Sequence, residues 1–193
     1  MKSAKFIRWM IFSIRVFLGL IFFTAGMAKL TQHFPGLIGP VWLEEKLAPF
    51  GLGLYARFIA YCQVIVGWLL LTQRFATLGA IMLFPLLLNI FMVTVSLEWR
   101  GTPYVNFFLL ILNGILLAYD FDKLKFILTD DTSELKPIGI HRPNRKSDAL
   151  WFGGLALILI SISLTAVNIW AMYVGVGAGF MTLLYARMMH NRN

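Results

Sequence analysis

The sequence has few charged residues: Asp, Glu, Lys and Arg make up 13% of its 193 residues, against about 25% in a typical soluble domain. Hydrophobic residues make up 59% of the chain, and its mean hydropathy is +0.76. A soluble domain of this size buries only about 70% of its chain's surface, so it cannot hide this much apolar area. The composition excludes an ordinary soluble domain and predicts an integral membrane protein.

Cysteine and histidine are also scarce. The one cysteine, Cys62, excludes an internal disulfide, a Cys-x-x-Cys redox pair and a cysteine zinc cluster. The three histidines, His33, His141 and His190, lie outside the long apolar runs, so a pair of haem ligands at membrane depth is missing. No metal-site spacing, nucleophile elbow or phosphate-binding loop is present. We therefore expect no haem, no metal and no covalent catalysis by this chain alone.

Long apolar runs mark helices that cross the roughly 30 Å of hydrocarbon in a bilayer, each needing about 20 residues. Four such runs span about residues 9–30, 55–71, 76–97 and 103–119, and a fifth covers residues 150–186. One helix of that last length would be about 55 Å long and exceed the bilayer, so we expect two spans with a turn near Asn168. The predicted fold is all-α: a four-helix membrane domain (residues 1–128), a basic linker (129–149) and a C-terminal apolar hairpin with a basic tail (150–193).

The basic residues predict the orientation. Lys2, Lys5 and Arg8 precede the first run, Arg74 follows the second, and six bases lie between residues 121 and 149. By the positive-inside rule, six spans with a cytoplasmic N-terminus put these bases on one side. The net charge of +8 comes from basic residues placed between apolar runs, and a role in membrane orientation explains this placement better than nucleic-acid binding does. The first run is too long for a signal peptide, and no Ala-x-Ala cleavage site follows it, so we expect it to be retained.

Polar residues inside the runs are informative, because each is costly in lipid unless it faces protein or water. In the first run, Arg15, Gly19, Phe22, Gly26 and Lys29 fall within an arc of about 80° on a helix. The other three runs carry similar stripes: Gln63 with Gly67; Pro85, Asn89, Met92 and Ser96; and Asn106, Asn113 and Asp120. Four polar stripes predict a bundle in which these faces meet at the centre.

Depth in the membrane predicts partners for the two cations of the first run. Arg15 lies in the cytoplasmic third, where Asp120 ends the fourth run, so we expect an ion pair between them. Lys29 lies at the outer edge, within reach of Glu44 or Glu98. In the alternative interpretation the polar side chains are only interhelical contacts, and both cations extend to the headgroups.

The motifs of these runs resemble those of a known family. The first run reads Arg15-x3-Gly19-x2-Phe22-x2-Ala25-Gly26-x2-Lys29 and resembles the opening signature of the DoxX family of bacterial membrane proteins. Three further segments are similar, so that the resemblance covers about residues 8–128: Lys46-Leu-Ala-Pro-Phe-Gly51, Gln63-x3-Gly67-x-Leu69-Leu70-Leu71 and Pro85-Leu-Leu-Leu-Asn89-Ile-Phe.

The resemblance implies a four-helix bundle in the bacterial inner membrane that is associated with redox systems. Relatives are described as a subunit of thiosulfate:quinone oxidoreductase, or as membrane partners of sulfur and oxidative-stress enzymes. Two features depart from the family. Gln63 stands where a glutamate is common, which removes an acid, and the chain after about Thr129 extends beyond the usual four helices.

Three functions remain open. The first is a redox-associated subunit that works with a partner oxidoreductase and binds a quinone or similar lipophile in a cavity lined by Arg15, Lys29, Gln63, Asn89 and Asn113. The second is a non-catalytic scaffold that assembles a larger membrane complex through the basic loop and the extra hairpin. The bases of that loop also suit anionic membrane lipids. The third is a small-molecule transporter, although the sequence shows no repeated halves and no pair of broken helices.

Overall fold

The computed structural model describes residues 2–128 and 145–191, and all regular structure within these ranges is helical. Six of the described helices are long and apolar enough to cross a membrane, which confirms the predicted all-α fold with six candidate spans. The chain divides into two compact units, residues 1–137 and 138–193, whose relative placement is not fixed. Of the predicted basic linker, residues 129–144 lie outside the described ranges.

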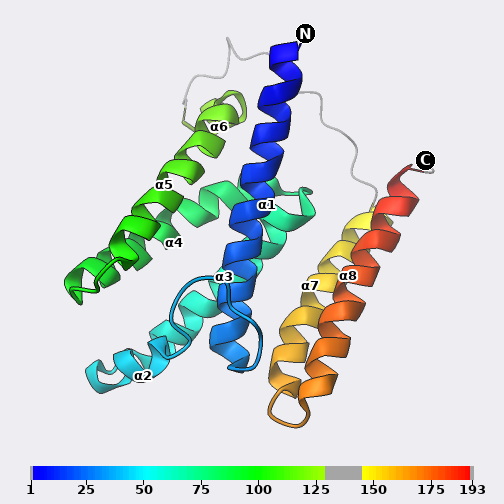
Figure 1. Ribbon diagram of the computed structural model, residues 1–193. Coiled ribbons are helices and arrows are strands. Elements are labelled where there is room, and N and C mark those ends of the chain that lie inside the picture. The colour runs from blue at the N-terminus through cyan, green and yellow to red at the C-terminus, as the bar shows by residue number, and fades with distance from the viewer. Residues whose placement is uncertain (1, 129–144, 192–193) are drawn as a thin grey trace. The chain divides into compact units, whose positions relative to one another are not determined.

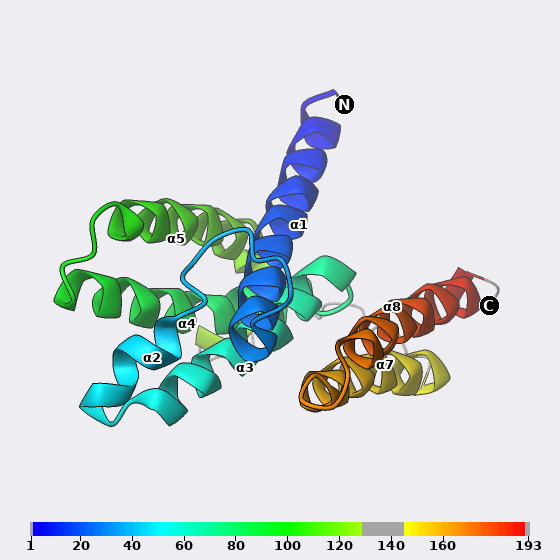
Figure 2. The ribbon, with the colours of Figure 1, turned by 60° about the horizontal axis from the view of Figure 1, so that its bottom comes forward.

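Four long helices form the first unit (Figure 1): α1 (Lys2–Thr31), α3 (Gly53–Thr72), α4 (Ala76–Ser96) and α5 (Thr102–Tyr119). Three short elements accompany them: α2 (Leu43–Leu47), the 3-10 turn η1 (Ala48–Phe50) and α6 (Phe121–Leu128). α1 packs on α3, α3 on α4, and α4 on α5, which returns to α1. Figure 2 shows the same succession from another side, with α4 and α5 side by side. We call the end formed by residues 32–52 and 97–101 the loop end.

The helix boundaries follow local chemistry. α1 starts at Lys2 rather than near Trp9, because no proline or glycine interrupts the first eight residues. α5 begins after Gly101, whose φ of 84° suits glycine, and it carries a proline in its first turn, where a missing N–H costs nothing. The other long helices of this unit begin and end within two residues of the predicted runs.

Glycines let α1 and α3 approach closely. A Cβ added at Gly26 would lie 2.6 Å from the Ala60 carbonyl oxygen, and one added at Gly67 would overlap the Phe23 backbone. These glycines therefore form a helix-packing face, as their spacing in the sequence predicts. Around this contact the described core is aliphatic and aromatic, built from Ile11, Leu18, Ile21, Phe22, Val66, Leu70, Ala80, Leu83, Leu87, Leu109 and Leu116.

The second unit is a helical hairpin of α7 (Arg145–Leu164) and α8 (Ile169–Asn191). Both ribbon views show the two helices side by side (Figures 1 and 2). The turn falls at Asn168, as predicted, and the Asn168 side-chain oxygen accepts a hydrogen bond from the Trp170 backbone N–H at 2.8 Å. Near the other end, the Ser147 hydroxyl donates to the Ala186 carbonyl at 3.2 Å. α7 begins at Arg145, so it includes the last five residues of the stretch predicted as a linker.

Candidate functional site

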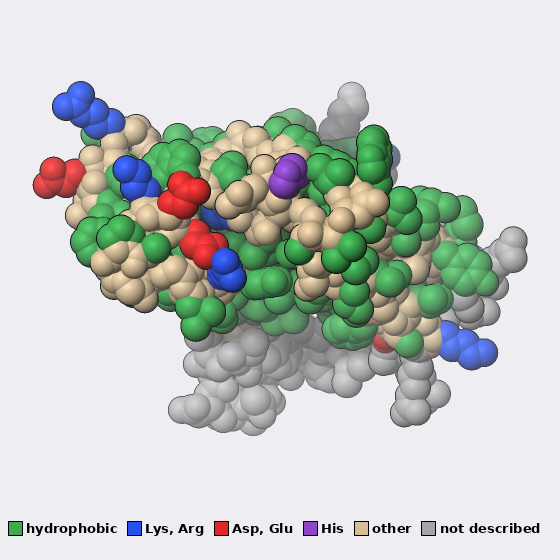
Figure 3. All heavy atoms as spheres, turned by 90° about the horizontal axis from the view of Figure 1, so that it is seen from below, with side chains coloured by type: hydrophobic (Ala, Val, Ile, Leu, Met, Phe, Trp, Pro, Cys, Tyr) green, Lys and Arg blue, Asp and Glu red, His purple; other side chains and the backbone are tan. Residues whose placement is uncertain are grey.

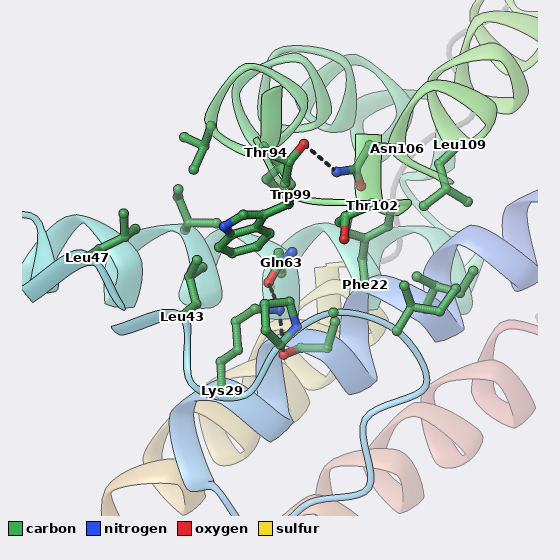
Figure 4. A pocket seen from close by; sticks show the side chains of 18 residues that line it. Phe22, Lys29, Leu43, Leu47, Gln63, Thr94, Trp99, Thr102, Asn106 and Leu109 are labelled. Atoms are coloured by element: carbon green, nitrogen blue, oxygen red, sulfur yellow. Dashed lines mark hydrogen bonds between the residues drawn. The ribbon is translucent and has the colours of Figure 1, made fainter. Parts of the chain in front are cut away.

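A pocket lies between α1, α3, α4 and α5 toward the loop end of the first unit (Figure 4). Its volume is about 50 Å³, which is room for a few water molecules. Most of its lining is apolar, and the polar side chains that reach it are Lys29, Gln63, Thr94, Trp99, Thr102 and Asn106. An apolar pocket with a few polar groups is the usual form of a small-molecule site.

One wall of this pocket carries a hydrogen-bonded pair from two helices. The Lys29 ammonium of α1 donates to the Gln63 Oε1 of α3 at 3.2 Å, and to the Ala25 carbonyl of its own helix at 3.3 Å (Figure 4). Gln63 is 4% exposed. The close α1–α3 approach at Gly26, one turn before Lys29, brings the two side chains within reach of each other. The wall therefore combines a cation with a buried amide.

The opposite wall is neutral. The Asn106 amide of α5 donates to the Thr94 hydroxyl of α4 at 3.3 Å, and that hydroxyl donates to the Phe91 carbonyl at 2.8 Å. Both side chains are buried. In Figure 4 the Trp99 ring is seen between this pair and the Lys29–Gln63 pair. Two polar walls thus face a common space that apolar side chains otherwise enclose.

A larger hollow of about 620 Å³ opens at the loop end beside the pocket. It shares Ile38, Gly39, Pro40, Trp99 and Thr102 with the pocket, so these residues form the partition between the two spaces. The hollow adds Trp42, Glu98, Arg100 and Val105. Viewed from below, charged side chains gather toward the side of α2, whereas hydrophobic atoms cover much of the rest of the described surface (Figure 3).

Lys29 does not have the acidic partners expected from the sequence. Glu44 accepts a hydrogen bond from the Arg57 guanidinium at 2.7 Å, and both side chains are well exposed. Glu98 lines the hollow rather than the pocket. Glu44 lies on the short helix α2, which packs on α3, and there it pairs with Arg57. In the described part of the chain, the partners of Lys29 are therefore the neutral Gln63 and Ala25 oxygens.

A second polar group, the Asp120 cluster, lies at the opposite end of the bundle and consists of Arg15, Thr77, Asp120 and Lys123. The Asp120 side chain is 2% exposed and accepts hydrogen bonds from the Arg15 guanidinium at 2.6 Å, Lys123 at 2.7 Å and the Thr77 hydroxyl at 2.9 Å. Burial alone would raise the pKa of this carboxyl. The hydrogen bonds from Lys123 and Thr77 and the charges of Arg15 and Lys123 outweigh it and hold the pKa below its ordinary value.

The structure separates the residues that the sequence grouped around one cavity. Lys29 and Gln63 line the pocket, whereas Arg15 pairs with Asp120 outside it. The predicted α4 stripe of Pro85, Asn89, Met92 and Ser96 is exposed, so the prediction that it faces the bundle centre is wrong, and Asn89 accepts a hydrogen bond from the Tyr55 hydroxyl. Asn113 is fully buried and donates to the Ala80 carbonyl at 3.2 Å. Arg15, Asn89 and Asn113 do not line the pocket.

Sequence reasoning missed the wall formed by Thr94, Trp99 and Asn106. A signal for Asn106 was present, because it shares the seven-residue stripe of Asn113 and Asp120. Depth alone did not show that Asn106 reaches the pocket while Asn113 does not. Thr94 lies on the face of α4 opposite to its predicted polar stripe, and Trp99 follows the helix, so nothing in the spacing marked them. Within the described ranges, no cluster of three or more His, Cys, Asp or Glu residues has the arrangement of a metal site.

The comparisons with known proteins concern this same bundle. Residues 10–96 match the sequence model of the DoxX family. The match covers most of α1 and all of α2, α3 and α4, and therefore both Lys29 and Gln63, and it ends before α5. No curated protein and no solved structure matches the chain.

Proposed function

Because residues 10–96 form a DoxX family domain within a multi-pass membrane protein, we propose that the protein is a redox-associated membrane subunit. It binds a quinone or similar lipophile in the pocket between α1, α3, α4 and α5. The electrons come from a partner oxidoreductase, because the protein's part is to bind and orient a cofactor that carries the redox chemistry.

The observation that carries this proposal is the Lys29–Gln63 pair in a lining that is otherwise largely apolar. A quinone needs an apolar slot for its ring and tail, and hydrogen-bond donors for its carbonyl oxygens. Lys29 and Gln63 supply donors on one wall, and Trp99 supplies an aromatic face beside them. Arg15, Asn89 and Asn113 are not part of this proposal, since they lie outside the pocket.

The volumes of the pocket and of the adjoining hollow indicate how a quinone ring would enter the pocket. A volume of about 50 Å³ is too small for a quinone ring, but the adjoining hollow holds about 620 Å³. Movement of Trp99 or of the segment 38–40 would join the two spaces, because these residues line both. A lipophile therefore reaches Lys29 and Gln63 by displacing this partition.

The setting that we propose is the bacterial inner membrane with the N-terminus in the cytoplasm. This orientation follows from the bases before α1, between α3 and α4, and after α5. It places the Asp120 cluster at the cytoplasmic side, and the pocket and hollow toward the outer side. The many large apolar side chains exposed on the six long helices then contact lipid.

Gentle-detergent purification from native membranes, followed by mass spectrometry of bound lipids and proteins, tests the proposal. We expect quinone enriched with the wild-type protein and lost with Gln63→Leu, which removes the amide from the pocket. Asn89→Leu is the matched control, because it makes a similar change in a neighbouring span outside the pocket. Quinone that is absent from the wild type, or equally retained by both variants, would contradict the proposal.

A scaffold function is the second candidate, and the hairpin α7–α8 is the observation that favours it. This hairpin forms a compact unit of its own beyond the matched family domain. An additional membrane unit is suited to docking a partner protein. A stoichiometric partner that co-purifies without quinone would support this function over lipophile binding.

A further inference from the structure

We propose that the pocket selects ligands that carry an anionic group, and that Lys29 provides the counter-charge. This inference deepens the proposed function where the ligand is a lipophile, because it names the chemistry of the head group. A neutral quinone carbonyl needs only a hydrogen-bond donor. An ionised hydroxyl or carboxylate needs a positive charge as well, and Lys29 supplies both.

The first support is that Lys29 reaches the pocket without a counter-ion from the described residues. Its hydrogen-bond partners, the Gln63 amide oxygen and the Ala25 carbonyl, are both neutral. Glu44 borders a small cavity that Lys29 also lines, but the Glu44 carboxylate is hydrogen-bonded to Arg57. A cation held away from water is costly unless it is paired. A ligand that brings a negative charge to Lys29 removes that cost.

Arg15 on the same helix shows the contrast. Arg15 has a carboxylate at 2.6 Å, because Asp120 at the end of α5 lies beside it. The bundle therefore pairs one inward-facing cation of α1 internally and leaves the other with neutral oxygens next to a cavity. The carbonyls in the last turn of α1 favour a positive charge at Lys29, but they supply only a partial negative charge.

Hydrogen-bond counting gives the second support. An ammonium group has three donors, and Lys29 uses two of them on oxygens at 3.2 and 3.3 Å. With the Gln63 oxygen bonded to Lys29, the amide NH₂ of Gln63 remains available as a donor for a ligand in the same pocket. The Lys29 wall thus offers spare donors and a charge, which is the arrangement that binds an anionic oxygen group.

The shape of the cavity gives two sources for that anionic group. The inner space of about 50 Å³ accepts a small oxyanion or the charged edge of a larger molecule. The hollow of about 620 Å³ can hold the remainder of such a molecule. A free carboxylate and an acidic lipophile share the same chemistry at Lys29, so the experiment has one arm for each.

The experiment uses the full-length protein in nanodiscs of zwitterionic lipid. An alkyl hydroxynaphthoquinone, ionised at neutral pH, and its neutral methyl ether are titrated while tryptophan fluorescence is recorded. Trp99→Phe identifies the quenching that arises at the pocket, since Trp99 lines it. We expect the ionised probe to bind at least tenfold more tightly than the ether to the wild type. Lys29→Met abolishes this preference, and Lys29→Arg keeps it.

Lys29→Met removes a charge that has no acidic partner among the described residues, so we expect the variant to fold, and its thermal unfolding provides the control. Equal binding of both probes to the wild type, or a preference that survives Lys29→Met, would overturn the anion assignment and leave lipophile binding intact.

Failure of both probes to bind would contradict the proposed function instead. Acetate then tests the anion site separately, through a Lys29-dependent change in Trp99 fluorescence, and the absence of that change overturns the inference. When the probe does bind, its displacement by acetate identifies a free anion as a ligand, and no displacement identifies the acidic lipophile.

Discussion

Lys29 Nζ and Gln63 Oε1 lie 3.2 Å apart across the contact between α1 and α3, at the wall of the pocket. The pair forms where Gly26 lets the two helices approach, so that the packing that holds the bundle together also positions the polar wall. Gln63 is neutral, and Lys29 therefore keeps its charge available for a ligand. The identity of residue 63 decides whether that charge is satisfied by the protein itself.

Replacing Gln63 with glutamate tests this relationship directly. We expect Gln63→Glu to place a carboxylate within hydrogen-bonding distance of Lys29 and to form an ion pair, because the two side chains already meet. The preference for an anionic probe over its neutral ether then falls about tenfold, as measured by fluorescence titration. Asn89→Asp is the control, since it adds a carboxylate at a position that does not line the pocket. A preference that persists in Gln63→Glu would show that Lys29 is not the residue that selects the anion.

The Asp120 cluster predicts a large effect of a small substitution. Asp120→Asn leaves the Arg15 guanidinium without its carboxylate partner, and breaking a buried ion pair costs about 3 kcal/mol or more. We expect the free energy of unfolding in mixed micelles to fall by that amount. Lys123→Met should cost no more than about 1 kcal/mol, because Lys123 is 54% exposed. Equal effects of the two variants would show that burial of the Arg15–Asp120 pair is unimportant.

The same carboxylate predicts how stability depends on acid. The pKa of Asp120 in the folded protein is lower than its ordinary value of 3.8, so its stabilising contribution is complete above that pH. The contribution is lost as the pH falls through the lower folded value, where the carboxylate takes up a proton. As the pH is lowered from 5 to 2, the thermal unfolding temperature should therefore fall more steeply for the wild type than for Asp120→Asn. Parallel profiles would contradict the lowered pKa.

Two glycines in different surroundings, one in the α1–α3 contact and one on α5, predict opposite effects of substitution by alanine. Gly67→Ala overlaps the Phe23 backbone, and such overpacking costs about 1–3 kcal/mol. Gly114→Ala on α5 meets no atom within 4 Å, so the better helix propensity of alanine should stabilise the helix by up to about 1 kcal/mol. The thermal unfolding temperature should therefore fall for Gly67→Ala and rise for Gly114→Ala. A neutral or stabilising Gly67→Ala would show that the helices are not in close contact there.

Much of the fold could be predicted from the sequence, because the membrane imposes simple rules. Apolar run lengths predicted six spans, and glycines at helical spacing predicted the close face between α1 and α3. Arg15 and Asp120 could be paired because both lie at the same predicted depth. That reasoning uses distance along a helix axis, which the sequence specifies directly.

The candidate site could be predicted only in part. The polar stripes of α1, α3 and α5 showed which side chains point inward, but not which of them border an empty space, and the predicted stripe of α4 faces outward. Asn113 and Asn106 share a stripe, yet Asn113 packs against the Ala80 carbonyl while Asn106 reaches the pocket. Asn89 faces outward with Tyr55, because α4 packs on α3 and α5 through its opposite face, which carries Leu83, Leu87 and Thr94. Which face of a largely apolar helix packs inward depends on many side chains together, and the spacing of its few polar residues does not show it.

Photo-crosslinking most directly tests the central claim, that a lipophile binds beside Lys29 and Gln63. The wild-type protein in native membranes is irradiated with an azido-quinone, and the labelled residues are mapped by mass spectrometry. We predict labels on side chains of the pocket and its partition, such as Trp99 and Ile38, and their loss in Gln63→Leu. Labels spread over the lipid-facing surfaces, with the same pattern in Gln63→Leu, would contradict the account.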